Sequence, residues 1–204
     1  MTLSARDRAR KIKVILFDVD GVLTDGRIWV FPAPVSEGGK MESRMVEFKG
    51  YNAHDGTAFS LLKIAGIKSG IITKRISETV AMRARDLKLD FVYQGQSYKM
   101  KPIRAILEQE GIGLDEIAYV GDDVIDLPAM RAVGFAVATA NARERVKAEA
   151  HYVTEHAGGD GAGRDAIEFV LDAQGILDKC IEAYIDEGNP LPPSMDIGKG
   201  GDAK

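Results

Sequence analysis

Short apolar segments alternate along this sequence with amphipathic stretches, and this alternation constrains the fold more than any other feature. Strands separated by helical segments pair in parallel, and the helices pack on the faces of the sheet. The sequence therefore predicts an α/β fold with a Rossmann-like parallel sheet flanked by helices. The predicted strands are Val14–Phe17, Lys68–Ile72, Phe91–Tyr93, Ile117–Val120, Phe135–Ala138 and Tyr152–Val153.

Five amphipathic segments predict the helices of this sheet. The first covers residues 55–66 and ends at a glycine, which is a common helix stop. Ser77 is predicted to cap the second helix, and Pro102 stands in the first turn of the third. The last two helices are predicted over Ala142–Glu149 and Arg164–Ala173.

Two stretches depart from the alternation. Residues 26–51 predict a β-hairpin inserted after the first strand, with strands Arg27–Phe31 and Met45–Phe48 joined by a Pro- and Gly-containing connection. This insertion is too small for a separate cap domain. Residues 189–204 have the composition of a flexible tail. We therefore expect one domain over residues 1–188, with a hairpin flap and a C-terminal tail.

Charge and composition exclude several classes of protein for this 204-residue chain. The net charge is −4, so no broad basic surface is expected for nucleic acid. The single cysteine, Cys180, excludes an intrachain disulfide framework and a Cys-rich zinc site. No apolar run approaches the roughly 18 residues of a membrane span, and Val14–Phe17 is too short for a signal-peptide core. We expect a cytoplasmic protein that binds neither nucleic acid nor membrane.

A first acidic cluster, Asp18, Asp20 and Asp25, follows the first predicted strand. Asp-Gly pairs are common turn formers, and one such pair would be read as a turn. In an open α/β sheet, however, this position faces the crevice where ligands bind. Three crowded carboxylates repel one another, which favours a bound cation.

A second acidic cluster, Asp122, Asp123 and Asp126, follows the fourth predicted strand. If the two strands are neighbours, Asp18, Asp20 and Asp122 form a small set of oxygen ligands of the kind that Mg²⁺ prefers. Asp126 is also expected to cap the next helix. Asp123 is expected either to support the metal or to lie on the surface.

Two further residues stand at the same edge of the predicted sheet. Thr73 ends the second strand, and Lys99 follows the third. Each is ordinary alone, but next to two acidic clusters they supply a hydroxyl and a cation for a phosphate dianion. Lys101 is the alternative lysine.

The order of these residues resembles the motifs of the haloacid dehalogenase superfamily of phosphohydrolases, over most of residues 12–173. Within that superfamily the sequence is most similar to the 3-deoxy-D-manno-octulosonate 8-phosphate phosphatases. The segments that carry this second resemblance are Phe17–Gly26, Tyr51–Gly56, Tyr93–Lys99, Tyr119–Asp126 and Gly158–Arg164.

The resemblance implies a mechanism with an aspartyl-phosphate intermediate. Asp18 would be the nucleophile and Asp20 the general acid and base. Mg²⁺ would be held by Asp18, the backbone carbonyl of Asp20 and Asp122. Thr73 and Lys99 would bind the phosphoryl oxygens.

Two departures from the family pattern concern the substrate. Lys74 replaces a glycine between Thr73 and Arg75, and His54 replaces an arginine before Asp-Gly. Lys74 or Arg75 is expected to bind the carboxylate of a sugar acid, and Arg164 matches an arginine that serves the family's active site. The expected substrate is 3-deoxy-D-manno-octulosonate 8-phosphate, with other sugar-acid phosphates, including nonulosonate 9-phosphates, left open.

The resemblance also implies a homotetramer in which the hairpins associate and neighbouring chains cover each capless site. Two alternatives of another class remain. One is a receiver domain, which keeps a long-lived phosphoaspartate. The other is a non-catalytic, phosphatase-like regulatory module, which has no need of both Asp18 and Asp20.

Overall fold

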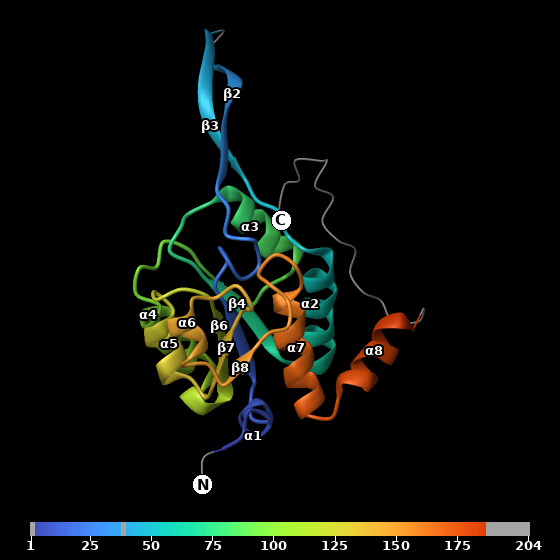
Figure 1. The fold of residues 1–204 in the computed structure, drawn as a ribbon. Helices are drawn as coiled ribbons and strands as arrows, with labels where there is room; N and C mark the ends of the chain where they lie inside the picture. Colours follow the sequence, from blue (N-terminus) through green and yellow to red (C-terminus); the bar gives the residue numbers. More distant parts are fainter. Residues whose placement is uncertain (1–2, 38–39, 187–204) are drawn as a thin grey trace.

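The computed structural model describes residues 3–37 and 40–186, and its centre is a sheet of six parallel strands (Figure 1). The strand order is β5-β4-β1-β6-β7-β8. The predicted Rossmann-like sheet is confirmed, and β6 alone differs from its predicted bounds, by one residue. The strands are β1 (Val14–Phe17), β4 (Lys68–Ile72), β5 (Phe91–Tyr93), β6 (Ile117–Gly121), β7 (Phe135–Ala138) and β8 (Tyr152–Val153).

Helices cover both faces of this sheet and bury two separate hydrophobic cores. In β1, Ile15 and Phe17 point into one core while Val14 and Leu16 point into the other, which explains its unbroken apolar sequence. The first core contains residues of α1 (Ala5–Ala9), α2 (Ala53–Ala65), α3 (Glu78–Asp86), α7 (Ala162–Ala173) and α8 (Leu177–Ile185). The second contains residues of α4 (Met100–Glu110), α5 (Leu127–Ala132) and α6 (Glu144–Lys147), and the short helix η1 (Leu114–Glu116) precedes β6.

Several helix ends differ from those predicted. Helix α2 begins two residues early because the Asn52 side chain accepts a hydrogen bond from the His54 N–H at 2.8 Å. Ser77 occupies the N-cap position of α3, but its hydroxyl lies 2.8 Å from Thr79 Oγ1 and caps no backbone N–H. Helix α7 also begins two residues early, α6 is shorter than predicted, and α1, η1 and α8 were not predicted.

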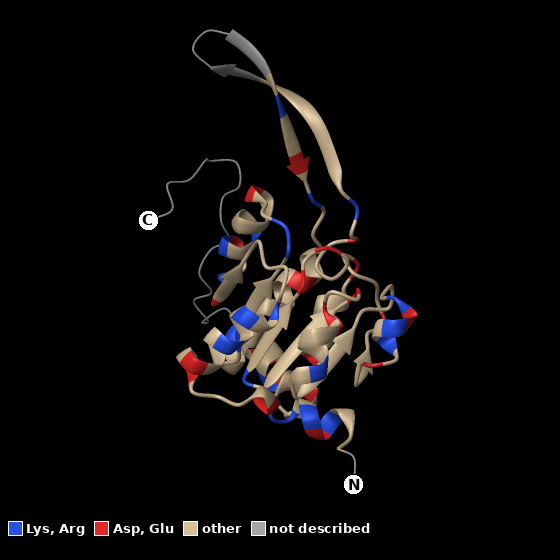
Figure 2. Ribbon diagram, turned by 90° about the vertical axis from the view of Figure 1, so that its left-hand side faces the viewer, with Lys and Arg blue, Asp and Glu red and all other residues tan. Residues whose placement is uncertain are grey.

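The hairpin is much longer than the sequence predicted. Its strands are β2 (Trp29–Glu37) and β3 (Lys40–Phe48), so most of the expected connection is strand. Pro32 and Pro34 are tolerated because they occupy alternate positions of a two-stranded ribbon, whose outer edge needs no backbone donor. The ribbon projects from the body as an arm (Figure 1), and most of the residues coloured as Lys, Arg, Asp or Glu in Figure 2 lie on the body.

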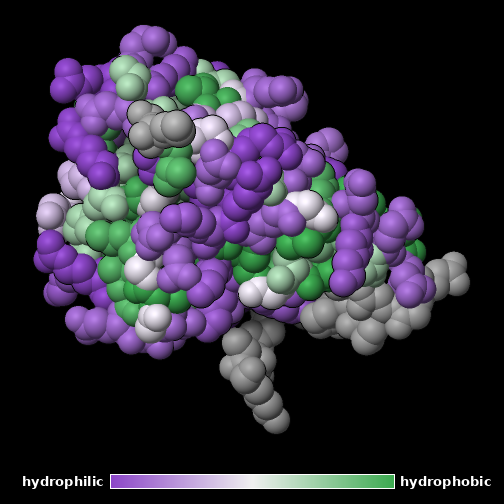
Figure 3. Space-filling view, turned by 90° about the horizontal axis from the view of Figure 1, so that it is seen from below, coloured by the Kyte–Doolittle hydropathy of each residue, from purple (hydrophilic) through white to green (hydrophobic). Residues whose placement is uncertain are grey.

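The lower part of this arm is apolar and exposed. The Trp29 and Phe48 rings stack with centroids 6.1 Å apart. The exposed apolar residues at the base of the arm are Ile28, Trp29, Val30, Phe31, Met45 and Phe48. Hydrophilic side chains cover most of the opposite end of the molecule (Figure 3). We call these six residues the apolar arm surface.

The described helices include none with both the length and the apolar character of a membrane span. The predicted tail, residues 189–204, and the predicted domain end at residue 188 lie outside the described residues.

Candidate functional site

The two predicted acidic loops meet at the carboxyl ends of β1 and β6. These strands pair in parallel with Phe17 opposite Val120, and the Asp18 N–H donates to the Val120 carbonyl at 3.0 Å. Gly21 makes the close approach possible, because a Cβ there would lie 2.1 Å from Asp122 Oδ2 and its φ of 85° favours glycine. The structure therefore brings Asp18 and Asp122 together.

Lys99 reaches the same point from the loop after β5. Its side chain is fully buried, and Nζ lies 2.7 Å from Asp18 Oδ2 and 2.6 Å from Asp126 Oδ1. A buried ammonium is retained only when charged partners compensate its lost hydration. Lys99 thus faces the expected nucleophile, whereas Lys101 is exposed on α4.

Asp126 occupies the predicted N-cap position of α5, but its side chain makes no capping hydrogen bond. Its Oδ1 accepts hydrogen bonds from Lys99 and from the Tyr119 hydroxyl, at 2.6 and 2.9 Å. Its Oδ2 accepts from the backbone N–H groups of Asp122 and Asp123, at 3.0 and 3.2 Å. The carboxylate turns back into the acidic loop because the buried Lys99 ammonium and these donors lie there, and it caps no N–H of α5.

We call Asp18, Lys99, Asp122 and Asp126 the strand-end centre. Burial, together with the Asp126 charge, raises the pKa of the Asp18 carboxyl to about 6 against the opposing effect of Lys99. Burial and the charges of Asp126 and Asp18 raise the pKa of the Asp122 carboxyl to about 7. Three carboxyl groups thus lie close to one ammonium group, in a site that is largely shielded from water.

The strand-end centre fits a hard divalent cation. One carboxylate oxygen from each of Asp18, Asp122 and Asp126 lies within 4.8 Å of the others. Since four donors already occupy the Asp126 carboxylate, Asp18 and Asp122 are the two that could act as ligands. Two carboxylates leave coordination positions for water and phosphate, as Mg²⁺ prefers. The sequence placed Asp20 in the metal set, and the family resemblance assigned its backbone carbonyl to the metal. Its carboxylate lies outside this group.

Asp20 instead belongs to a second group of charges at the base of the arm. The Lys49 ammonium contacts Asp20 Oδ1 and lies 3.5 Å from Glu47 Oε1. From the turn after β4, an Arg75 terminal nitrogen lies 2.6 Å from Glu47 Oε1, and Nε lies 3.6 Å from Asp20 Oδ2. We call Asp20, Glu47, Lys49 and Arg75 the hairpin-base cluster.

Electrostatics within the hairpin-base cluster favour the ionised form of Glu47. Burial raises the pKa of Glu47, but hydrogen bonds from Ser77 and Arg75 and the Lys49 charge outweigh it, so the pKa falls below its usual value. Two cationic side chains thus pair with the two carboxyl groups of the cluster.

Thr73 and Lys74 share one turn but have different surroundings. Thr73 is buried, its N–H donates to the Tyr93 carbonyl at 2.9 Å, and its Oγ1 accepts from the Arg75 N–H at 3.4 Å. Lys74 is exposed. The structure therefore fixes Thr73 at the end of β4 and leaves Lys74 at the surface.

Arg164 is placed by its backbone rather than by its guanidinium. Its N–H donates to Asp55 Oδ1 at 2.8 Å, joining the first turns of α2 and α7. In the described part of the chain its Nε pairs with Glu168 at 2.6 Å and not with the strand-end centre. Within one chain, the predicted contribution of Arg164 to the site is therefore not seen.

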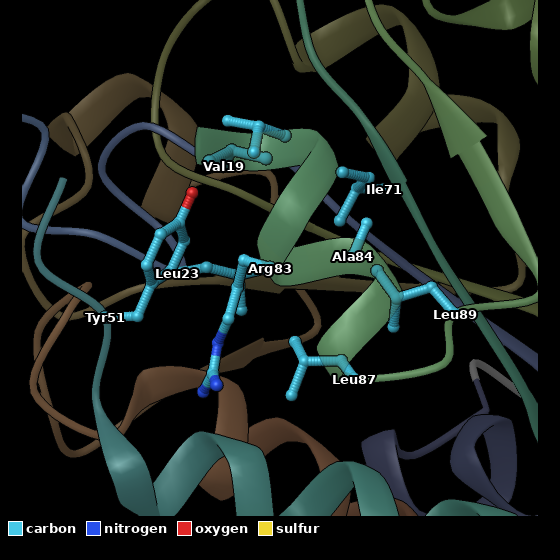
Figure 4. A pocket seen from close by; sticks show the side chains of 9 residues that line it. Val19, Leu23, Tyr51, Ile71, Arg83, Ala84, Leu87 and Leu89 are labelled. Carbon is cyan, nitrogen blue, oxygen red and sulfur yellow. The ribbon is translucent and has the colours of Figure 1, made fainter. Parts of the chain in front are cut away.

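A small pocket lies behind the loop that carries Asp20, and Figure 4 shows Tyr51 and Arg83 in its lining. Its volume of about 10 Å³ is close to the space of a single water molecule. A sugar acid does not fit in this pocket.

Sequence reasoning missed Glu47 and Lys49 of the hairpin-base cluster, and it missed Tyr119, whose hydroxyl donates to Asp126. Tyr119 reads as an ordinary strand residue, and Glu47 and Lys49 read as polar residues at the end of an exposed strand. Nothing in the sequence alone distinguishes Glu47 and Lys49 from other polar residues, because their partners Arg75 and Asp20 lie 28 and 29 positions away.

Comparisons with known proteins extend these observations. A family model described as haloacid dehalogenase-like hydrolase matches residues 65–164. The 3-deoxy-D-manno-octulosonate 8-phosphate phosphatase of Escherichia coli K12 is 38% identical over 172 residues, 84% of this chain and 86% of its own.

Two solved structures give the same picture. The phosphatase of that name from Yersinia pestis is 36% identical with a TM-score of 0.76, covering 85% of this chain and 88% of its own. The one from Moraxella catarrhalis, in complex with a magnesium ion, a phosphate ion and KDO, is 34% identical with a TM-score of 0.78, covering 88% and 97%. The similarity thus extends well beyond the segment that the family model matches.

Proposed function

This chain belongs to the haloacid dehalogenase-like hydrolases, and from that premise we propose that it is a Mg²⁺-dependent phosphatase of 3-deoxy-D-manno-octulosonate 8-phosphate. One observation carries the activity: the Asp18 carboxylate is held 2.7 Å from a fully buried lysine, beside the Asp122 carboxylate. The names of the relatives support the substrate.

In the proposed reaction Asp18 attacks phosphorus and forms an aspartyl-phosphate, while Asp20 gives its proton to the departing sugar oxygen. Asp20 then takes a proton from the water that hydrolyses this intermediate. Asp18 and Asp122, with the Asp20 backbone carbonyl, would hold Mg²⁺, which when bound neutralises charge between nucleophile and phosphate.

Two residues are proposed to bind the phosphoryl oxygens. Lys99 already contacts the nucleophile, and its charge opposes the negative charge that develops at phosphorus. The Thr73 hydroxyl, at the adjoining strand end, donates to a second oxygen.

The direct test is phosphate release from 3-deoxy-D-manno-octulosonate 8-phosphate, with and without Mg²⁺. The panel adds a nonulosonate 9-phosphate and a hexose phosphate that lacks a carboxylate. We expect Mg²⁺-dependent turnover that chelation stops, with the octulosonate ester as the best substrate. Absence of turnover on every ester of the panel, with Mg²⁺ present, would contradict a phosphatase.

Arg75 is the proposed carboxylate-binding residue, supported by its place in the turn beside Thr73, with exposed Lys74 as a second cation. A charge-assisted hydrogen bond contributes about 1.5–3 kcal/mol, so the hexose phosphate should lose more than about tenfold in kcat/KM. Equal efficiency on the hexose phosphate would contradict this assignment.

We further propose that four chains assemble through the apolar arm surface. Exposed Trp29, Phe31 and Phe48 form a contiguous aromatic cluster, and such patches mark interaction sites. Light scattering should give a tetramer, and Phe31→Ser with Phe48→Ser should dissociate it without unfolding the body. A wild-type monomer at micromolar concentration would contradict the assembly.

Assembly would allow Arg164 to act on a neighbouring chain. Mixed tetramers of an Asp18→Asn chain and an Arg164→Ala chain should then regain activity, since one kind of site receives both intact residues. No recovery in well-mixed tetramers would place the role of Arg164 within its own chain.

The reaction is proposed to take place in the cytoplasm. A phosphorylated sugar acid carries several charges and does not cross a bilayer unaided. Cell fractionation with an antibody to the chain tests this assignment.

A further inference from the structure

Lys49 lies directly after the last residue of the arm strand β3, yet its side chain is fully buried. Its ammonium contacts two carboxylates, Asp20 and Glu47. A lysine at the end of an exposed strand would ordinarily keep its charged group in water. This side chain instead turns inward, toward the loop that follows β1.

Burial of an ammonium costs free energy that only good partners offset. Glu47 would be a partner within the arm, but its Oε1 is also bound by Arg75 at 2.6 Å and lies 3.5 Å from the Lys49 ammonium. The contact with Asp20 Oδ1 is the shorter one. The geometry thus directs the Lys49 charge mainly to Asp20.

Asp20 stands in the turn that follows β1, and the hydrogen bonds within this turn do not hold its carboxyl group. Backbone bonds from Val22, Leu23 and Thr24 to the Val19 carbonyl fix the turn but not the Asp20 side chain. Arg75 Nε, at 3.6 Å, makes no hydrogen bond to it. Among the described residues, Lys49 is the donor whose contact fixes the position of the carboxylate.

We propose that Lys49 is a positioning residue that holds the Asp20 carboxyl group where it transfers protons during phosphate-ester hydrolysis; this rests on the proposed function. In the first step the Asp18–phosphorus bond forms, the bond from phosphorus to the sugar oxygen breaks, and the Asp20 proton moves to that oxygen. In the second step a water proton returns to Asp20 as the water oxygen displaces Asp18. Lys49 itself exchanges no atom.

This role predicts dependence on the leaving group. A sugar alkoxide leaves poorly without a proton, whereas p-nitrophenolate leaves without one. A displaced Asp20 therefore slows the first step for the sugar ester alone. It slows water activation for both, because both esters give the same aspartyl-phosphate.

The experiment compares wild type, Lys49→Met, Lys49→Arg and the matched control Lys63→Met, an exposed lysine of α2. Lys49→Met should lower kcat/KM for 3-deoxy-D-manno-octulosonate 8-phosphate by about 10²-fold, the cost of a small misplacement. For p-nitrophenyl phosphate kcat/KM should change less than about threefold, and a pre-steady-state burst of p-nitrophenol should appear. Lys49→Arg should recover most of the loss, and Lys63→Met should match wild type.

Each other result overturns the proposal. An equal loss of kcat/KM on both esters would assign Lys49 a structural role, and no loss on either would leave it without one. If circular dichroism shows that Lys49→Met does not fold, the charge-balanced double variant Lys49→Met with Glu47→Gln replaces it. The ratio between its losses of kcat/KM on the two esters then decides in the same way. A wild type inactive on both esters would overturn the proposed function itself.

Discussion

The strand-end centre and the hairpin-base cluster each contain one fully buried lysine, but they differ in charge balance. Lys99 faces three carboxylates, and the pKa values of Asp18 and Asp122 are raised. Lys49 shares two carboxylates with Arg75, and the pKa of Glu47 is lowered. The first group has an excess of carboxylates that a bound cation would balance, whereas in the second two cationic side chains pair with two carboxyl groups. The two neighbouring clusters therefore differ in whether their charges are balanced by the protein's own side chains.

The largest expected effect distinguishes the two groups by activity. Asp18→Asn should lower kcat by on the order of 10⁴-fold or more on every phosphate ester, since no other group replaces the nucleophile. Asp20→Asn should lower kcat/KM much more for a sugar phosphate than for p-nitrophenyl phosphate. Steady-state kinetics on both esters measure this, with exposed Asp178→Asn as the control. The same dependence of kcat/KM on the leaving group in Asp18→Asn and Asp20→Asn would contradict the different roles proposed for the two residues.

Stability should separate the groups next. Asp126→Ala leaves the Lys99 ammonium with Asp18 alone and orphans the buried Tyr119 hydroxyl, so it should cost about 3–5 kcal/mol. Glu47→Ala should cost about 1 kcal/mol, because Arg75 is partly exposed and the buried Lys49 keeps Asp20 as its partner. Urea unfolding without metal measures both. Similar costs would mean that the hairpin-base cluster is as integral to the core as the strand-end centre.

The raised pKa values predict how metal-free stability changes with pH. A raised folded pKa gives Asp122 a contribution that is present below its usual value near 4 and lost as pH rises through about 7. Without metal, the free energy of unfolding of Asp122→Asn should thus be higher than that of wild type by about 2–4 kcal/mol at pH 8. This difference in stability should disappear by pH 4. Mg²⁺ should reverse the order at pH 8 by stabilising wild type alone. A pH-independent gap would contradict the crowding of carboxylates.

The smallest expected effect is the contribution of Glu47 to stability, and its pH dependence is opposite to that of Asp122. The lowered pKa of Glu47 gives a contribution that is present above its usual value near 4.5 and lost as pH falls. Glu47→Gln should therefore be less stable than wild type by under about 1 kcal/mol at pH 7, and equal to it near pH 3. Thermal unfolding across this range measures the change. A stability difference between Glu47→Gln and wild type that grows at acidic pH would contradict an ionic interaction of Glu47.

The strand-end centre could be predicted from sequence because topology alone brings its parts together. Parallel strands end at one edge, so Asp18, Thr73, Lys99 and Asp122 had to converge once the strands were known. Asp126 was misread because an acid before Leu-Pro matches a helix cap. Its actual direction is set by Lys99, which lies 27 residues earlier in the chain.

The hairpin-base cluster could not be predicted because its geometry depends on how the arm leaves the body. Prolines and glycines between residues 32 and 39 are compatible with a loop as well as with a ribbon. The prediction of a loop from the sequence was wrong, because β2 extends to Glu37. Because the strand length was unknown, the directions of the Glu47 and Lys49 side chains were unknown too. In the structure these directions are set by the pairing of β2 with β3, which places Trp29 opposite Phe48.

The four hydrogen bonds of Asp126 also have a kinetic meaning. They join the start of α4, the middle of β6 and the acidic loop, so no one of these segments can adopt its final form alone. During refolding, Lys99 can settle beside Asp18 only when this whole region has closed around the carboxylate. Enzyme activity should therefore return in step with the last cooperative phase of folding, and a half-folded chain should have no weak activity of its own.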